Sequence, residues 1–163
     1  DKMAKRILII CSIVLSLAVA VSAGESGISP QTEKEVKNFL DRQVRAFVDR
    51  DLEALMAMLA PDASVVMLGN GPDDRWVGPG QIQKAYSGQM AQYISETFKL
   101  TWTSIGAKDN IAWFAAQCLI VQTRQPKKQV TFRINWTGVL EKRKAKWLLV
   151  QSHFSFPAPE PGR

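Results

Sequence analysis

The stretch Val130–Pro157, with the sequence VTFRINWTGVLEKRKAKWLLVQSHFSFP, decides the fold. β-branched and aromatic residues fill both of its arms, and a basic segment at 142–146 separates them, which predicts two long antiparallel strands joined by a turn. Successive side chains of a strand point to opposite faces. Because both faces of this hairpin carry apolar groups, we expect the sheet to be covered twice, by its own helices and by a second copy of the chain.

The two faces of the hairpin are expected to have different roles. The face under the helices is predicted to line a ligand pocket, through Arg133, Asn135, Thr137, Val150, Ser152 and Phe154. Val44 and Met67 are expected to lie opposite them. The other face is predicted to contact a partner copy in a homodimer, through Phe132, Ile134, Trp136, Leu149 and His153. A β-bulge would reverse this assignment in either strand.

The chain before the hairpin predicts helices followed by strands. Apolar residues at three- and four-residue spacing indicate a helix that starts at Ser29 or Thr32 and runs to about Arg50. Asp51 is expected to cap a second helix, and a third is expected to follow Gly78. Further strands are expected at 64–68, 75–77, 98–104 and 111–123. Three helices on one face of a curved antiparallel sheet make a cone-shaped α+β fold, whose interior is a natural pocket.

Composition indicates one globular domain. The chain has 163 residues, of which 46% are hydrophobic and 22% charged, with a net charge of +6. Its basic clusters, Lys127-Lys128 and the segment 142–146, lie at opposite ends of one predicted strand, roughly 40 Å apart at about 3.3 Å per residue. They cannot form one patch, and no stacking aromatic residues are interleaved with them. We therefore expect no nucleic-acid partner.

The N-terminal residues are typical of a secretory signal. Lys5-Arg6 precede the apolar run Ile7–Val21, and small residues end the segment at Ala23. The run is shorter than the roughly 20 residues that a membrane span needs. We expect a signal peptide at 1–23, a linker at 24–30, the domain at 31–157 and a proline-rich tail at 158–163. The mature protein is then periplasmic or secreted and keeps no stable membrane anchor.

Three motifs carry a resemblance to a known family. FVDRDLEALMAMLAPDASVV at 47–66, RWVGPGQIQKAY at 75–86 and KWLLVQSHFSFP at 146–157 resemble the SnoaL-like families of the nuclear transport factor 2-like superfamily, over about Gln31–Pro157. The closing motif is also similar to that of the calcium/calmodulin-dependent kinase II association domain. The superfamily includes isomerases, hydrolases, cyclases and non-catalytic oligomerisation domains. The resemblance therefore implies a pocket and usually a dimer, and leaves the activity open.

The resemblance also allows a residue-by-residue test of two chemistries. Ketosteroid isomerases use a tyrosine, a general base and a protonated aspartate, which an approximate alignment places at Val44, Met67 and Thr137. Neither valine nor methionine can transfer a proton, so we expect no isomerase mechanism of that type. The arginines of the kinase-type pocket fall at Gly138 and Phe154. Binding of a carboxylate ligand is not expected from that resemblance.

Metal and nucleophile sites are not indicated. His153 is the single histidine of the chain, so it has no second imidazole with which to bind zinc. It also has no nucleophile and orienting group beside it in the predicted hairpin. Cys118 lies in an apolar run and is expected to be a buried thiol. We expect no metal and no cofactor.

Three hypotheses for the function remain. The first is an exported small-molecule-binding protein with an apolar pocket between helices and sheet. The second is an enzyme, isomerase-like or hydrolase-like, in which Arg133, Asn135 and Thr137 donate hydrogen bonds to a polarised carbonyl. The third is an oligomerisation module. A carboxylate near Thr137 would favour the enzyme, and an empty, collapsed cavity would favour the oligomerisation module.

Overall fold

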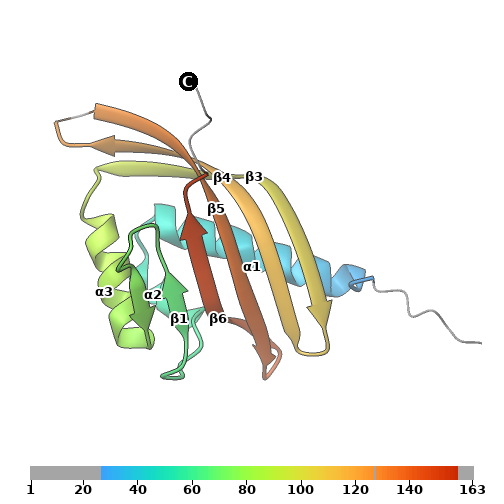
Figure 1. Ribbon diagram of the computed structural model, residues 1–163. Helices are drawn as coiled ribbons and strands as arrows, with labels where there is room; N and C mark the ends of the chain where they lie inside the picture. The colour runs from blue at the N-terminus through green and yellow to red at the C-terminus, as the bar shows by residue number, and fades with distance from the viewer. Residues whose placement is uncertain (1–26, 127, 158–163) are drawn as a thin grey trace, which may run out of the picture.

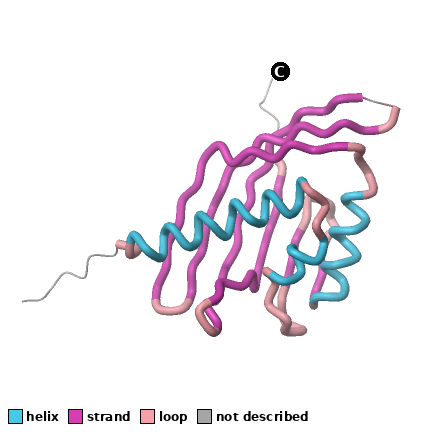
Figure 2. The backbone as a smooth tube through the Cα atoms, turned by 180° about the vertical axis from the view of Figure 1, so that it is seen from behind, coloured by secondary structure: helices cyan, strands magenta, loops and turns pink. Residues whose placement is uncertain are grey.

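The computed structural model describes residues 27–126 and 128–157. These residues form a strongly curved, unclosed sheet with helices along its concave side (Figure 1, Figure 2). The predicted cone-shaped α+β class is confirmed. The predicted signal peptide, residues 24–26 of the predicted linker and the predicted tail at 158–163 lie outside the described residues.

Helix α1 spans Pro30–Val48 and crosses the concave side of the sheet. Ser29 caps it, because its Oγ accepts a hydrogen bond of 3.1 Å from the backbone N–H of Thr32. Pro30 opens the first turn, where a missing N–H costs nothing. The apolar stripe of this helix is buried against the sheet, through Val36, Phe39, Leu40, Ala46 and Phe47.

Two shorter helices complete the helical layer. Helix α2, Leu52–Ala57, is capped as predicted by Asp51, whose Oδ1 accepts from Ala54 N–H at 2.9 Å. Helix α3, Pro79–Met90, follows Gly78, which has a φ of +81°. A positive φ is open to glycine at little steric cost. The chain can therefore leave the sheet at Gly78 and turn directly into α3.

The sheet contains six strands in the described residues. They are β1 (Val66–Leu68), β2 (Arg75–Val77), β3 (Ser95–Lys108), β4 (Ile111–Arg124), β5 (Lys128–Arg143) and β6 (Lys146–Ser155). Their order across the sheet is β2-β1-β6-β5-β4-β3. All neighbouring pairs are antiparallel except β1 and β6, which run parallel with Met67 beside Ser152. This exception was not predicted. The segment after α2 already meets β6 in the parallel sense, through the bridge between Leu59 and Leu149.

Two bulges interrupt the long strands. In β3 the pairing with β4 shifts between Leu100 and Trp102. In β6, Leu149 pairs with Leu140 while Gln151 pairs with the preceding residue of β5, so Val150 is an extra residue. A bulge bends its strand and moves the following side chains to the other face. The bulge at Val150 decides which residues of β6 face the helices.

The β5–β6 hairpin is attached to α1 through Glu35. Its Oε2 accepts from Lys142 Nζ at 2.6 Å and from Trp147 Nε1 at 2.9 Å. These charge-assisted hydrogen bonds lower the pKa of Glu35 to about 2. The contacts hold one end of α1 against the turn of the hairpin. None of the helices in residues 27–126 and 128–157 has the length and apolarity that a bilayer crossing requires.

Candidate functional site

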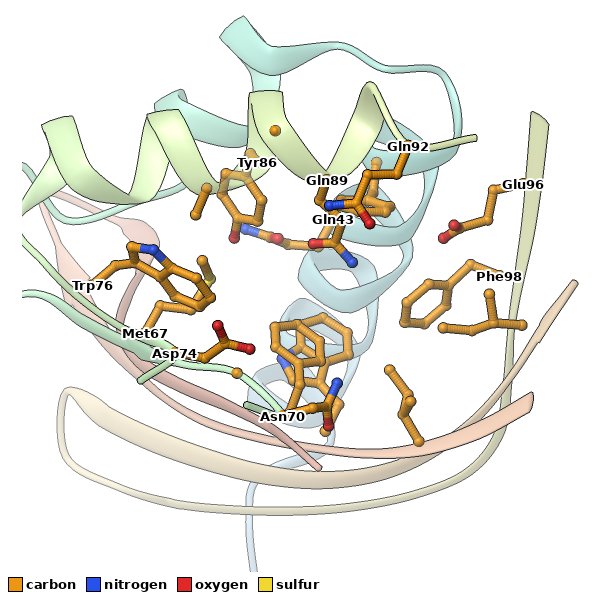
Figure 3. Close-up of a pocket in the computed structure, with 18 of the residues that line it drawn as sticks. Gln43, Met67, Asn70, Asp74, Trp76, Tyr86, Gln89, Gln92, Glu96 and Phe98 are labelled. Atoms are coloured by element: carbon orange, nitrogen blue, oxygen red, sulfur yellow. The ribbon is translucent and has the colours of Figure 1, made fainter. Parts of the chain in front are cut away.

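A cavity of about 330 Å³ lies between the helices and the concave face of the sheet. Residues of α1, of α3 and of all six strands line it, together with the loop between β1 and β2 (Figure 3). Ligand pockets in proteins commonly start at about 300 Å³. The cavity is therefore large enough for a molecule of one or two rings.

Aromatic side chains form much of the apolar part of the cavity wall. Seven of them line it: Phe47, Trp76, Tyr86, Phe98, Phe132, Trp136 and Phe154. Five of these rings, all except those of Trp76 and Phe132, pack against one another mainly edge to face, with centroid separations such as 6.1 Å between Phe98 and Trp136. Such pairs restrain ring rotation. The apolar wall is thus formed before any ligand arrives.

Trp136 is the centre of this wall and is 3% exposed. Its ring stacks on Phe154 at 5.5 Å and meets Phe114 edge to face at 4.8 Å. Gly138 leaves room for the Phe114 ring, since a Cβ there would lie 2.7 Å from it. The indole Nε1–H donates to the buried hydroxyl of Ser152 at 2.9 Å. Each buried polar atom of this pair is therefore satisfied by the other.

One end of the cavity is polar. Glu96 on β3 is 6% exposed, and its Oε2 accepts a hydrogen bond from Gln122 Nε2. Gln122 Oε1 in turn accepts from Arg124, at 3.0 Å from Nε and 2.6 Å from Nη2. Burial raises the pKa of Glu96, and the hydrogen bond from Gln122 opposes that shift. A carboxyl group with a raised pKa is suited to exchange a proton or a hydrogen bond with a ligand.

Gln43 lies on the helix side of the same cavity. It is 4% exposed, and its Nε2 has no hydrogen-bond partner. Figure 3 shows its amide among the rings and polar groups of the cavity, between Tyr86 and Glu96 in that view. Buried amides are nearly always paired. An unpaired donor here marks a position where a ligand can bond.

The loop between β1 and β2 contributes a second carboxylate. Asp74 Oδ2 accepts from the backbone N–H of Gly71 at 2.7 Å, which folds the loop back on itself. A Cβ at Gly69 would lie 2.8 Å from the Asp74 side chain and 2.9 Å from the Trp76 ring. The glycine therefore lets Asp74 and Trp76 pack against the loop backbone where it borders the cavity.

The predicted pocket residues are only partly brought together. Val44, Met67 and Phe154 line the cavity, and Ser152 is buried beneath it as the partner of Trp136. Val150, the extra residue of the bulge, does not line it. Arg133, Asn135 and Thr137 lie on the opposite, convex face of β5, which is a correction. These three side chains therefore do not line the cavity in which the enzyme hypothesis placed them.

The predicted partner face also needs correction. Phe132, Ile134 and Trp136 line the cavity, and Leu149 is 1% exposed in the core. Only His153 keeps the predicted outward position, because the bulge at Val150 reverses the alternation between Leu149 and His153. The physical reason for the inversion in β5 is burial. Its more apolar face packs under the helices, and its more polar face points outward.

Sequence reasoning missed Gln43, Asp74 and Glu96. Glu96 was missed because β3 was expected to begin at Phe98, whereas it begins at Ser95. The alternation of Glu96 with Phe98 and Leu100 was the available signal. Gln43 interrupts the apolar stripe of α1, and a polar residue on a buried helix face is a further signal of a site.

Metal and nucleophile chemistry have little support among the described side chains. No group of three or more His, Cys, Asp or Glu residues in residues 27–126 and 128–157 is arranged to hold a metal ion. Cys118 is 1% exposed, and burial raises the pKa of its thiol to about 12. It is therefore protonated at neutral pH and a poor nucleophile.

The comparisons with known proteins concern the fold and the family. The model of the SnoaL-like domain matches residues 36–159. A structure from Streptomyces avermitilis, titled a "putative dehydratase from the NTF2-like family", has a TM-score of 0.74 and 19% identity, and the match covers 80% of this chain and 100% of that one. A nuclear transport factor 2-like superfamily protein from Salmonella enterica serovar Typhimurium has a TM-score of 0.73 and 18% identity, covering 80% and 94%.

A third structure, from Xanthomonas campestris, carries the name of a calcium/calmodulin-dependent protein kinase II association domain, also qualified as putative. It has a TM-score of 0.70 and 19% identity, covering 82% of this chain and 94% of that one. No curated protein matches the chain. Identities this low show a shared fold and leave the activity open. The family match spans most of the described residues, and the chain belongs to the SnoaL-like domain family.

Proposed function

We propose that the protein binds a mainly apolar, ring-containing small molecule in the cavity between its helices and its sheet. The observation that carries this proposal is the cavity of about 330 Å³ with seven aromatic side chains in its wall. Burying apolar ligand surface against such a wall contributes about 25 cal/mol per Å². Little is lost to ordering the wall, because its rings are already packed.

Two positions of this cavity lack the proton-transferring groups of ketosteroid isomerases. Val44 and Met67 line the cavity, at the positions where the family resemblance implies a tyrosine and a general base. Neither side chain can exchange a proton. Binding is therefore the function that these residues support best.

The test is calorimetric titration of the protein with 2-methylnaphthalene, an apolar two-ring probe. We expect saturable binding of one probe molecule. Ala85 lines the cavity from α3, so Ala85→Trp should fill the space and abolish binding. Ala57→Trp, at the exposed end of α2, is the matched control and should bind as the wild type does. Absence of binding by the wild type, or equal binding by Ala85→Trp, would refute the proposal.

Proton-transfer catalysis at Glu96 is a second candidate function. It is favoured by the buried carboxyl group with a raised pKa that lines the cavity. A general base at this position would remove a proton next to a carbonyl. The probe is 2-tetralone in deuterated buffer, with exchange of its α-protons followed by nuclear magnetic resonance (NMR). Exchange that is no faster than in buffer, or unchanged in Glu96→Gln, would exclude this function.

We also propose that the mature protein acts outside the cytoplasm, after removal of residues 1–23. The charged, apolar and small-residue succession of that segment supports export. N-terminal sequencing of exported protein should give a start near Gly24. A start at Met3 would contradict cleavage.

A homodimer remains our proposal for the assembly, now through the convex face of β3–β6. None of the described helices lies on that face (Figure 1), and Trp102 and Trp113 are 52% and 50% exposed on it. Strands β3–β6 together offer a surface of roughly 45 Å by 19 Å, if each residue adds about 3.3 Å along a strand and each strand adds about 4.8 Å across the sheet. That is close to the roughly 800 Å² per partner of a stable interface.

A further inference from the structure

Two side chains of the cavity each have an atom without a hydrogen-bond partner, a donor in one and an acceptor in the other. Gln43 Nε2 is a buried donor without an acceptor. Glu96 uses Oε2 to accept from Gln122, and among residues 27–126 and 128–157 no hydrogen bond engages its Oε1. Both residues line the same cavity, and Figure 3 shows both in its wall, with Phe98 beside Glu96. A ligand in this cavity can therefore meet both a donor and an acceptor.

The fold holds Glu96 in position. Gln122 and Arg124 follow one another on the inward face of β4 and form a hydrogen-bonded chain that ends on the carboxylate. On the other side, Arg50 Nη2 donates to the carbonyls of Tyr93 and Ile94, the second at 2.8 Å. This clamp fixes the residues just before β3. Glu96 is thus preorganised, and a ligand need not order it.

The position of Gln43 is fixed by the helix that carries it. It lies between Leu40 and Phe47 on the buried stripe of α1, and both neighbours are packed in the core. A buried amide without its hydrogen bond destabilises the fold by the full desolvation penalty of the group. A ligand that supplies the missing acceptor recovers this free energy on binding. A ligand with an acceptor at this end of the cavity is therefore favoured.

A hydroxyl group is the smallest ligand group that meets both needs, since it donates one hydrogen bond and accepts others. A carbonyl can only accept, and an ammonium group can only donate. We propose that the cavity selects an aromatic or polycyclic ligand bearing a hydroxyl group, whose O–H donates to Glu96 Oε1 and whose oxygen accepts from Gln43 Nε2. This inference rests on the proposed function and defines the class of its ligand.

The experiment compares 2-naphthol with 2-methylnaphthalene, which has a methyl group in place of the hydroxyl. Titration calorimetry gives the ratio of their affinities in each protein. In the wild type, 2-naphthol should bind at least as tightly as 2-methylnaphthalene, although water hydrates its hydroxyl more strongly. In Gln43→Leu and in Glu96→Gln, the affinity for 2-naphthol relative to that for 2-methylnaphthalene should fall by about tenfold, which is the effect of one lost hydrogen bond.

Two controls separate the outcomes. Glu53 is exposed on α2, and Glu53→Gln should leave the ratio unchanged. Circular dichroism checks that each variant is folded, and Glu96→Gln keeps the shape of the side chain if Gln43→Leu fails to fold. Binding of both probes with the same ratio in wild type and variants would overturn the hydroxyl subsite and leave the proposed function intact. Failure of the wild type to bind either probe would overturn both.

Discussion

Replacing Trp136 by Phe should destabilise the fold chiefly by stranding the Ser152 hydroxyl. The Trp136 Nε1–H donates a hydrogen bond of 2.9 Å to Ser152 Oγ, and the serine is 1% exposed. Leaving a buried polar group without its partner costs about 1–3 kcal/mol. The lost ring atoms add roughly 1–2 kcal/mol, because the packed neighbours relax only partly. We therefore expect a decrease of about 2–5 kcal/mol in the free energy of unfolding.

The double variant separates the hydrogen bond from the packing. Ser152→Ala alone strands the indole N–H and should destabilise by about 1–3 kcal/mol. In Trp136→Phe/Ser152→Ala both polar groups are absent, so neither is stranded. The double variant should lose less than the sum of the single variants, by about 1–2 kcal/mol, as expected for directly bonded residues.

The assay is urea unfolding followed by circular dichroism, with all proteins at one concentration. Ser155, the last residue of β6, faces outward, and its replacement is the control for Ser152→Ala. Ser155→Ala should change the free energy of unfolding by no more than about 0.5 kcal/mol and should add independently to Trp136→Phe. Strict additivity for Trp136 and Ser152 would refute the reasoning, because it would show that their side chains do not meet on the inner face.

Three further predictions follow from the charged and exposed groups. Hydrogen bonds from Lys142, Gln31 and Trp147 lower the pKa of Glu35 to about 2. The contribution of Glu35 to stability should therefore be present above pH 4.5 and be lost as the pH falls from 4.5 to about 2. In urea unfolding, Glu35→Gln should be less stable than the wild type at pH 7 but not at pH 2. Burial raises the pKa of Glu96 above 4.5, so the wild type should lose stability as the pH rises through that raised value. Glu96→Gln should therefore be more stable than the wild type at pH 7. An equal or lower stability of the variant at pH 7 would contradict the burial of Glu96. Trp113→Glu on the convex face should shift the protein from dimer to monomer in sedimentation at tens of micromolar without changing its circular dichroism; a wild type that sediments as a monomer, or a dimer unaffected by the substitution, would exclude this interface.

The elements of the fold could be predicted from local sequence rules. The caps at Ser29 and Asp51 both form the expected hydrogen bonds, and the strand at Arg75–Val77 has its predicted bounds. Capping and alternation depend on neighbours in the chain, so the sequence carries them directly. The parallel pairing of β1 with β6 depends on how distant segments meet, and no local pattern contains it.

The faces of the hairpin could not be assigned in the same way. Alternation predicts which residues of β5 share a face, and those groupings are found in the structure. It does not say which face the helices cover. Both faces of β5 carry apolar groups, and the bulge at Val150 reverses the phase of β6. A bulge leaves little local signal when, as here, it falls within the apolar run Leu148–Val150.

The polar end of the cavity could be predicted only in part. Glu96 follows the alternation of β3, so extending that strand by three residues would have placed it on the inner face. Its meeting with Gln43 depends on the angle at which α1 crosses the sheet, which brings together residues more than fifty positions apart. Packing of the whole helical layer sets that angle. The sequence of either element alone does not specify it.

The position of the bound ligand tests the central claim most directly. Met67 is 4% exposed and lines the cavity, whereas Met56 does not. In protein carrying methyl-¹³C methionine, the Met67 signal, assigned through Met67→Leu, should shift saturably as 2-naphthol is added, with the dissociation constant found by calorimetry, while the Met56 signal should stay in place. A Met67 signal that does not move while calorimetry shows complete binding would place the ligand elsewhere and contradict the account.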